Sequence, residues 1–184
     1  LDRLALAAPP ASLAATVFEP ASQQGWPGLR ELEQQTTRLL SLQSIPQEIF
    51  GGQLAFNLRA ATDGEALRRR MAAETAALRT QPGAAPPALE LLQAPLFHAT
   101  LLSLYVNYAR QPDPAALAAS LHSPWLTVNP EPDALAAAAS DTIQIGPPRA
   151  DPAGGFWITA ALDNLRRTVH AGLDAALAVL GSRR

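Results

Sequence analysis

Apolar and polar residues alternate with two different periods along the chain, and these periods predict its secondary structure. Residues 12–18 are apolar and end in β-branched and aromatic side chains, which favours a strand. From Leu29 to Leu42 apolar residues recur at helical spacing between charged and amide side chains, so an amphipathic helix is expected. The long alternating stretch 96–109 predicts an extended strand. The other predicted elements are strands at 53–58, 88–93, 125–128, 142–146 and 156–162, and helices at 64–79, 113–121, 133–140 and 164–180.

This order of elements predicts an α+β fold. We expect a mixed, largely antiparallel sheet with helices on one face, because long neighbouring strands alternate irregularly with helices. No internal repeat and no internal domain boundary is visible, so residues 1–184 are expected to form a single domain. The loops at 80–87 and 147–155 are then surface excursions.

Charge and hydropathy limit the kinds of partner that this chain is expected to bind. The formal net charge is −2 and only 16% of residues are charged, which leaves no electrostatic footprint for nucleic acid. The longest uncharged stretch, Leu91 to Ala109, contains Gln93, Pro95, His98 and Asn107, so it predicts a buried strand and not a membrane span. No signal peptide is evident, and a soluble, cytoplasmic protein is expected.

General motifs for catalysis or metal binding are not found. The chain has no cysteine, which excludes disulfides, cysteine-ligated zinc and a thiolate nucleophile within it. His98, His122 and His170 lack the spacing of metal ligands, so no metal site is expected. Neither a glycine-rich phosphate loop nor a nucleophile elbow occurs.

Three short stretches nevertheless resemble one known family. Gln53 to Leu58 reads QLAFNL, the segment Ala73-Glu74-Thr75 follows it, and Phe156 to Arg167 reads FWITAALDNLRR. Together they resemble the C-terminal half of the aspartate-semialdehyde dehydrogenase family, from about Thr16 to the end. The resemblance implies a substrate and dimerisation domain, a homodimer, and a sheet face packed against the partner subunit. It also implies that the N-terminal nucleotide-binding domain, which would bind NADP, is absent from this chain; the non-Met start is consistent with a fragment or a processed product.

The same resemblance implies where the catalytic residues would stand, and several differ. The family uses a cysteine thiolate upstream of the matched region, and this chain has none. Glu19 takes the place of an orienting glutamine. With Pro95 as the anchor, Gln93 takes the place of the arginine that holds the substrate carboxylate, and Thr100 that of the histidine base. A register shifted by two would let His98 serve instead, since a strand keeps residues 98 and 100 on one face, but the displacement of about 6.6 Å is too large for a preorganised site.

Only a few of the family's substrate-binding and cofactor-binding positions keep the family's residue in this chain. Glu74 matches the family's substrate-binding glutamate, but the lysine expected three residues later is Ala77. Asp163 and Asn164 match the family at the junction before the final helix, where helix capping alone would preserve them. In the family that helix packs partly on the nucleotide domain, so Leu173, Leu177 and Leu180 are expected to be unusually exposed here.

Three functions remain open from the sequence. The first is the dimerisation domain of a divergent aspartate-semialdehyde dehydrogenase-like protein whose catalytic set has decayed. The second is the substrate domain of an active NADP-dependent enzyme with a changed substrate, one without the second carboxylate. The third is an unrelated protein-interaction module.

Overall fold

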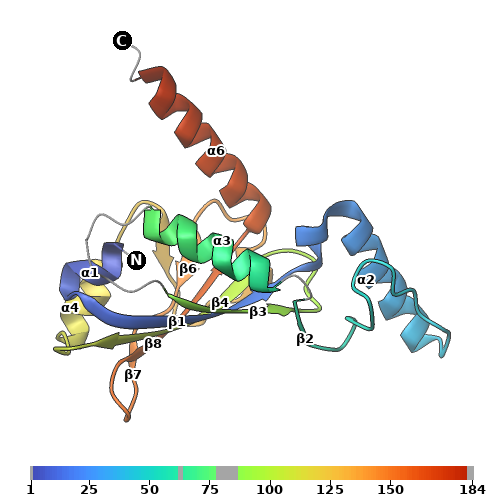
Figure 1. The fold of residues 1–184 in the computed structure, drawn as a ribbon, viewed down its shortest axis with the longest axis horizontal. Coiled ribbons are helices and arrows are strands. Elements are labelled where there is room, and N and C mark those ends of the chain that lie inside the picture. Colours follow the sequence, from blue (N-terminus) through green and yellow to red (C-terminus); the bar gives the residue numbers. More distant parts are fainter. Residues whose placement is uncertain (1, 62–63, 78–86, 182–184) are drawn as a thin grey trace.

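We describe a computed structural model of the chain for residues 2–61, 64–77 and 87–181 (Figure 1). The helices are α1 (Asp2–Ala7), α2 (Gly25–Leu40), α3 (Gly64–Ala77), α4 (Pro114–Ser120), α5 (Ala134–Ala137) and α6 (Asn164–Gly181), with a 3-10 turn at Ala21–Gln24. The strands are β1 (Pro10–Glu19), β2 (Arg59–Ala60), β3 (Ala88–Gln93), β4 (Thr100–Tyr108), β5 (Leu126–Val128), β6 (Ile143–Ile145), β7 (Arg149–Ala150) and β8 (Phe156–Leu162).

All eight strands belong to one mixed sheet. Its order is β2-β3-β1-β4-β8-β6-β5, with β7 paired to β8 beside this path. The pairs β1–β3 and β5–β6 are parallel and the other pairs are antiparallel. The predicted mixed, largely antiparallel α+β fold is therefore confirmed.

One face of the sheet carries the main core. In β1, Leu13, Ala15 and Val17 alternate inward, and Leu13 and Ala15 join a buried cluster with residues of β4, β8, α1 and α4. Figure 1 shows α3 and α6 on one side of the sheet and the β7 hairpin on the other. The four-residue α5 is an exception: Ala137 packs with Ala161, whose side chain lies on the opposite face.

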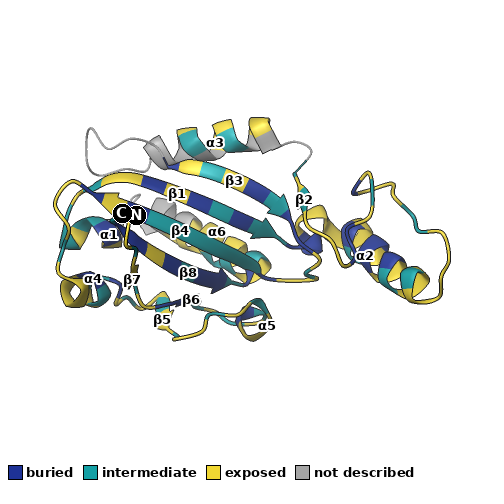
Figure 2. Ribbon diagram, turned by 90° about the horizontal axis from the view of Figure 1, so that it is seen from below, coloured by how far each residue is buried: buried dark blue, intermediate teal, exposed yellow. Residues whose placement is uncertain are grey.

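The opposite face is mostly uncovered. Figure 2 looks onto it, with β1, β3, β4 and β8 across the view and α6 behind them. Thr16, Ser103 and Thr159 occupy paired positions on three adjacent strands of this face, and all are only partly buried. The aromatic pair Tyr105 and Trp157, with ring centroids 4.9 Å apart, lies on the same face.

A lobe built on α2 projects from the end of the sheet. Its loop is held by Gln35, which is fully buried: Nε2 donates to the carbonyls of Pro46 and Gly52 at 2.8 and 3.0 Å, and Oε1 accepts from the N–H groups of Leu54 and Ala55. The carboxylate of Glu31, also buried, accepts from the backbone N–H groups of residues 49 and 50 at 2.7 and 3.1 Å.

Two expectations about strands are wrong. The predicted strand at 53–58 is a turn-containing loop, because Gln35 holds two of its N–H groups, Phe56 has a φ of +59°, and Asn57 N–H closes a turn on Leu54. The predicted strand 96–109 is shorter than expected, since β4 begins at Thr100 after Ala99 adopts a φ of +67°. The sequence pattern also missed α1, β2 and β7, and β7 lies inside the predicted loop 147–155. The predicted loop at 80–87 lies outside the described residues except for residue 87.

No helix among the described residues is long and apolar enough to cross a bilayer.

Candidate functional site

The carboxyl ends of the parallel strands β1 and β3 bring the altered family positions together. Glu19 and Gln93 are paired across these strands. The β1–β4 register runs to Phe18 and Leu101, so one further step places Thr100 across from Glu19. Because paired residues of adjacent strands share a face, Gln93, Glu19 and Thr100 form a row on the face that carries the main core. This arrangement agrees with the alignment anchored on Pro95.

Backbone hydrogen bonds fix the segments that follow the two strands. Ala94 N–H donates to the carbonyl of Glu19 at 2.9 Å. Ala21 N–H donates to the carbonyl of Leu96 at 2.7 Å, and Ser22 N–H to that of Phe97 at 3.0 Å. The residues around Glu19 and Gln93 are therefore held by the sheet even beyond the strand ends.

Glu19 is partly buried, and its carboxylate has no hydrogen bond or ion pair with any residue that the structure describes. Burial raises the pKa of this carboxyl group above its ordinary value. The negative charge at this position is thus destabilised and not compensated from within the described chain.

Gln93 is buried, with 7% of its surface exposed, and its Oε1 atom receives no hydrogen bond. Buried polar atoms without a partner are uncommon in native structures. On its other side Gln93 pairs with Arg59 of β2. The Arg59 guanidinium donates instead to the carbonyls of Phe50 and Gly51 in the α2 lobe.

Asp163 and Asn164 lie at the junction between β8 and α6 and have different roles. Asp163 caps α6: Oδ1 accepts from the N–H groups of Leu165 and Arg166 at 3.0 and 2.9 Å, and Oδ2 accepts from that of Ala139 at 2.8 Å. Burial alone would raise the pKa of Asp163, but these three N–H donors and the charge of Arg166 together lower it.

Asn164 joins the junction to the end of β1. Its Oδ1 accepts from the hydroxyl of Ser22 at 3.2 Å, and its Nδ2 donates to Oε1 of Gln23 at 3.5 Å. The helix-capping role expected for both residues is therefore confirmed for Asp163, whereas Asn164 binds the segment after Glu19.

The strand geometry that the alternative involving His98 assumed is not present. His98 is exposed and precedes the left-handed Ala99, so it lies outside β4 and the strand periodicity that would have kept it on the face of Thr100 does not apply. Glu74 lies within α3, and its side chain is outside the described residues.

Sequence reasoning missed Gln23 and Arg59 and passed over Ser22 as a site residue. Ser22 could have been identified from the stretch VFEPAS, which also contains Glu19. Arg59 could not be found because a loop was predicted as a strand, and only the β2–β3 pairing places it beside Gln93.

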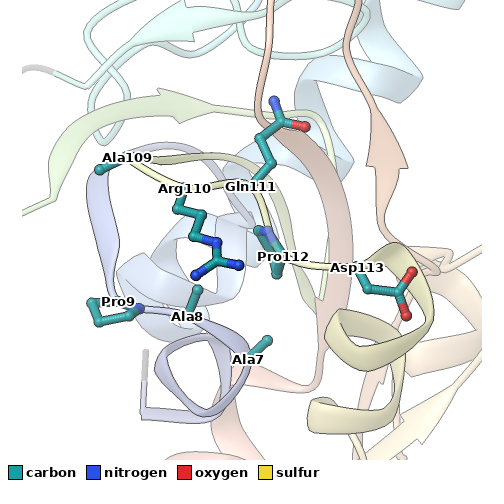
Figure 3. Close-up of a pocket in the computed structure, with 8 residues that line it drawn as sticks. All are labelled: Ala7, Ala8, Pro9, Ala109, Arg110, Gln111, Pro112 and Asp113. Atoms are coloured by element: carbon teal, nitrogen blue, oxygen red, sulfur yellow. The ribbon is translucent and has the colours of Figure 1, made fainter.

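The clefts differ in their distance from this row: one of about 460 Å³, lined by Leu102, Leu104 and Ala160, lies on the same face of the sheet. A cleft of about 500 Å³ between the end of α1 and the loop before α4 is lined by Arg110, Gln111 and Asp113 (Figure 3). It adjoins Pro10, at the start of β1, whereas Glu19 ends that strand about 30 Å away. Within the described residues no group of His, Cys, Asp and Glu side chains could hold a metal ion.

The chemistry open to the row is limited by its residue types. An amide and a hydroxyl do not titrate near neutral pH and carry no charge, so neither provides a base or a cation. Glu19 contributes an acid without a positively charged partner. The row can accept hydrogen bonds, but it offers no guanidinium to grip a carboxylate.

Comparisons with known proteins agree on one family. The model of the semialdehyde dehydrogenase dimerisation domain matches residues 1–167. A USG-1 protein homolog from Pseudomonas aeruginosa is 32% identical over 171 residues, which cover 85% of this chain and 49% of that protein. The chain thus spans about half the length of this relative.

Solved structures give the same result. The structure of a probable aspartate-semialdehyde dehydrogenase from Pseudomonas aeruginosa is similar with a TM-score of 0.84 and 29% identity, over 96% of this chain and 57% of that one. Aspartate semialdehyde dehydrogenase II from Vibrio cholerae, at 20% identity, shares the fold with a TM-score of 0.83 over 92% of this chain and 55% of that one. The chain belongs to the semialdehyde dehydrogenase family and corresponds to its dimerisation domain.

Proposed function

We propose that this chain is the dimerisation domain of a cytoplasmic, homodimeric protein that resembles aspartate-semialdehyde dehydrogenase but does not catalyse that reaction. The row of Gln93, Glu19 and Thr100 carries the proposal. These positions hold an amide, an acid and a hydroxyl, where the family resemblance implies an arginine, a glutamine and a histidine. The substrate carboxylate would lose its cation and meet a negative charge.

NADP is proposed to bind outside this chain. The exposed side of α6 presents Leu165, Val169 and Leu173, which offer no side-chain hydrogen bond to a nicotinamide carboxamide. A cofactor that reached this side of the helix would meet a largely apolar surface, interrupted by the hydroxyl of Thr168, which donates to the carbonyl of Asn164 at 2.7 Å.

The test is an assay of the whole protein. NADPH oxidation with β-aspartyl phosphate is measured beside an active aspartate-semialdehyde dehydrogenase at equal concentration. Because the histidine base and the arginine that binds the substrate carboxylate are both missing, we expect a rate lower by more than about 10³-fold. A rate typical of the active enzyme would contradict the proposal.

A changed substrate is the second candidate, and the uncharged amide of Gln93 is the observation that favours it. An active enzyme with this residue would accept an acyl phosphate that lacks the second carboxylate. β-Alanyl phosphate differs from β-aspartyl phosphate by that group alone. NADPH oxidation with β-alanyl phosphate would support the second candidate, and its absence would contradict that candidate.

A further inference from the structure

Two acceptors lie side by side at the carboxyl ends of β1 and β3, and neither receives a hydrogen bond. Oε1 of Gln93 is buried without a donor. The carboxylate of Glu19, at the paired position on the next strand, has no partner among the residues described. Turning the Gln93 amide over would not solve the problem, because Nε2 would then take the buried place of Oε1.

The arginines of neighbouring elements do not supply the missing donor. Arg59 of β2 donates to the carbonyls of residues 50 and 51. On α6, Arg166 forms an ion pair with Asp141 at 2.9 Å, and Arg167 donates to the carbonyl of Asp141 at 3.1 Å. Each of these cations therefore has partners other than Glu19.

A positively charged hydrogen-bond donor would satisfy this arrangement. An ammonium group has three N–H donors and no acceptor, so a single group can serve the Glu19 carboxylate and the Gln93 carbonyl together. A charge-assisted hydrogen bond to the carboxylate is the stronger of the two. Glu19 itself is only partly buried.

We propose that the ends of β1 and β3 form a binding site for a primary ammonium group, with Glu19 as the charged acceptor and Gln93 as the neutral one. The site thus selects a cation where the family resemblance implies the recognition of an anion. This specificity does not depend on whether the whole protein has dehydrogenase activity.

The test uses n-butylammonium chloride and sodium n-butyrate as probes, at matched ionic strength with sodium chloride as the blank. Backbone amide shifts are followed by NMR in the chain. Butylammonium is expected to give saturable shifts at residues 19, 21, 22, 93, 94, 96, 97 and 164. Butyrate, which carries the opposite charge on the same alkyl chain, is expected to give none that saturate.

Two substitutions assign the effect. Glu19→Gln keeps the shape and removes the charge, and is expected to weaken butylammonium binding by about tenfold or more. Glu33→Gln, at an exposed position of α2, is the matched control and leaves the affinity unchanged. Gln93→Leu removes the orphan acceptor, so it is expected to raise the Tm of the free chain and reduce the gain in Tm from butylammonium.

Three results would overturn the proposal: no saturable butylammonium shifts at these residues, equal binding of butyrate, or an affinity in Glu19→Gln equal to that of Glu33→Gln.

Discussion

Asp163 holds two elements at once, since one carboxylate oxygen caps α6 and the other fixes the turn at Ala139. The turn needs this bond, because Ala139 has a φ of +68°, a conformation that is unfavourable for alanine. A single side chain therefore stabilises both the start of the last helix and the approach of the α5 segment.

Replacement of Asp163 tests this double role. Asp163→Ala is expected to lower the free energy of unfolding by about 1–2 kcal/mol at pH 7, as measured by urea denaturation. The folded-state pKa lies below the ordinary value of 3.8, so the stabilisation is present above that value and is lost as the pH falls through the folded pKa. The difference between wild type and variant should shrink toward pH 3. A difference that stays constant from pH 7 to pH 3 would contradict the ionic origin.

Short-range chemistry at this junction could be predicted from the sequence, and long-range partners could not. Capping by Asp163 depends on residues two and three positions away, so the local pattern contains it. The bond from Ser22 to Asn164 joins residues 142 positions apart, and no local pattern encodes such a pair. The row of Gln93, Glu19 and Thr100 became visible only through strand pairing, although each position was identified from the family resemblance.

At the scale of elements, the α2 lobe depends on hydrogen bonds more than on regular structure. Gln35 satisfies two carbonyls and two N–H groups of a loop that has no strand of its own. In the sequence this glutamine looks like one more polar residue on an amphipathic helix. The apolar residues within 53–58 predicted a strand. The neighbouring sequence does not reveal that the buried side-chain amide of Gln35 accepts hydrogen bonds from two N–H groups of this segment.

Gln35→Ala is expected to destabilise the lobe selectively. Four backbone groups lose their partner, of which the two N–H groups are buried, and a buried unsatisfied group costs about 1–3 kcal/mol. Hydrogen exchange at the amides of Leu54 and Ala55 should accelerate by at least about tenfold, while the amides of β4 and β8 keep their protection. The exposed neighbour Gln34 provides the control, since Gln34→Ala should leave all these rates unchanged. Uniform acceleration across the sheet in Gln35→Ala would show that the lobe is not a separate unit.

At the scale of the whole molecule, two surfaces remain apolar or uncovered. The predicted exposure of α6 is confirmed for Leu173 and Leu177, at 57% and 66%, and Leu180 lies outside the residues whose side chains are described. The sheet face that bears Ser103 and Trp157 has little covering it (Figure 2). Sheets with helices on one face commonly need another layer on the second when that face is apolar.

The α6 leucines should not contribute to the stability of this chain. The double substitution Leu173→Gln and Leu177→Gln is expected to change the free energy of unfolding by less than about 0.5 kcal/mol, because both side chains already meet solvent. Ile158→Ala, in the buried cluster, should cost about 2–5 kcal/mol in the same urea experiment. A large loss in the α6 variant would mean that the helix packs against the rest of the chain.

The proposed homodimer should depend on the uncovered sheet face. Ser103→Arg places a charge at the middle of this face, and burying it unpaired would cost about 2–5 kcal/mol, or a weakening of dimerisation by at least about 30-fold. Sedimentation should then report a monomer with unchanged circular dichroism. Gln34→Arg on the α2 lobe serves as the control and should remain dimeric. Dimerisation of Ser103→Arg with the affinity of the control would exclude this face.

The central position of β1 has a consequence for how the chain acquires its structure. This strand pairs in parallel with β3 and antiparallel with β4, so the Ala14–Ala88 contact closes a loop of about 70 residues. The loop contains the whole α2 lobe and α3, and closing it carries an entropic cost before any sheet contact compensates for it. During synthesis the middle of the sheet cannot form until β4 has left the ribosome. Until then the apolar residues Leu13 and Val17 of β1 remain exposed to solvent. We expect slow folding, with the local helices forming before the sheet and aggregation competing until β1 is enclosed on both sides.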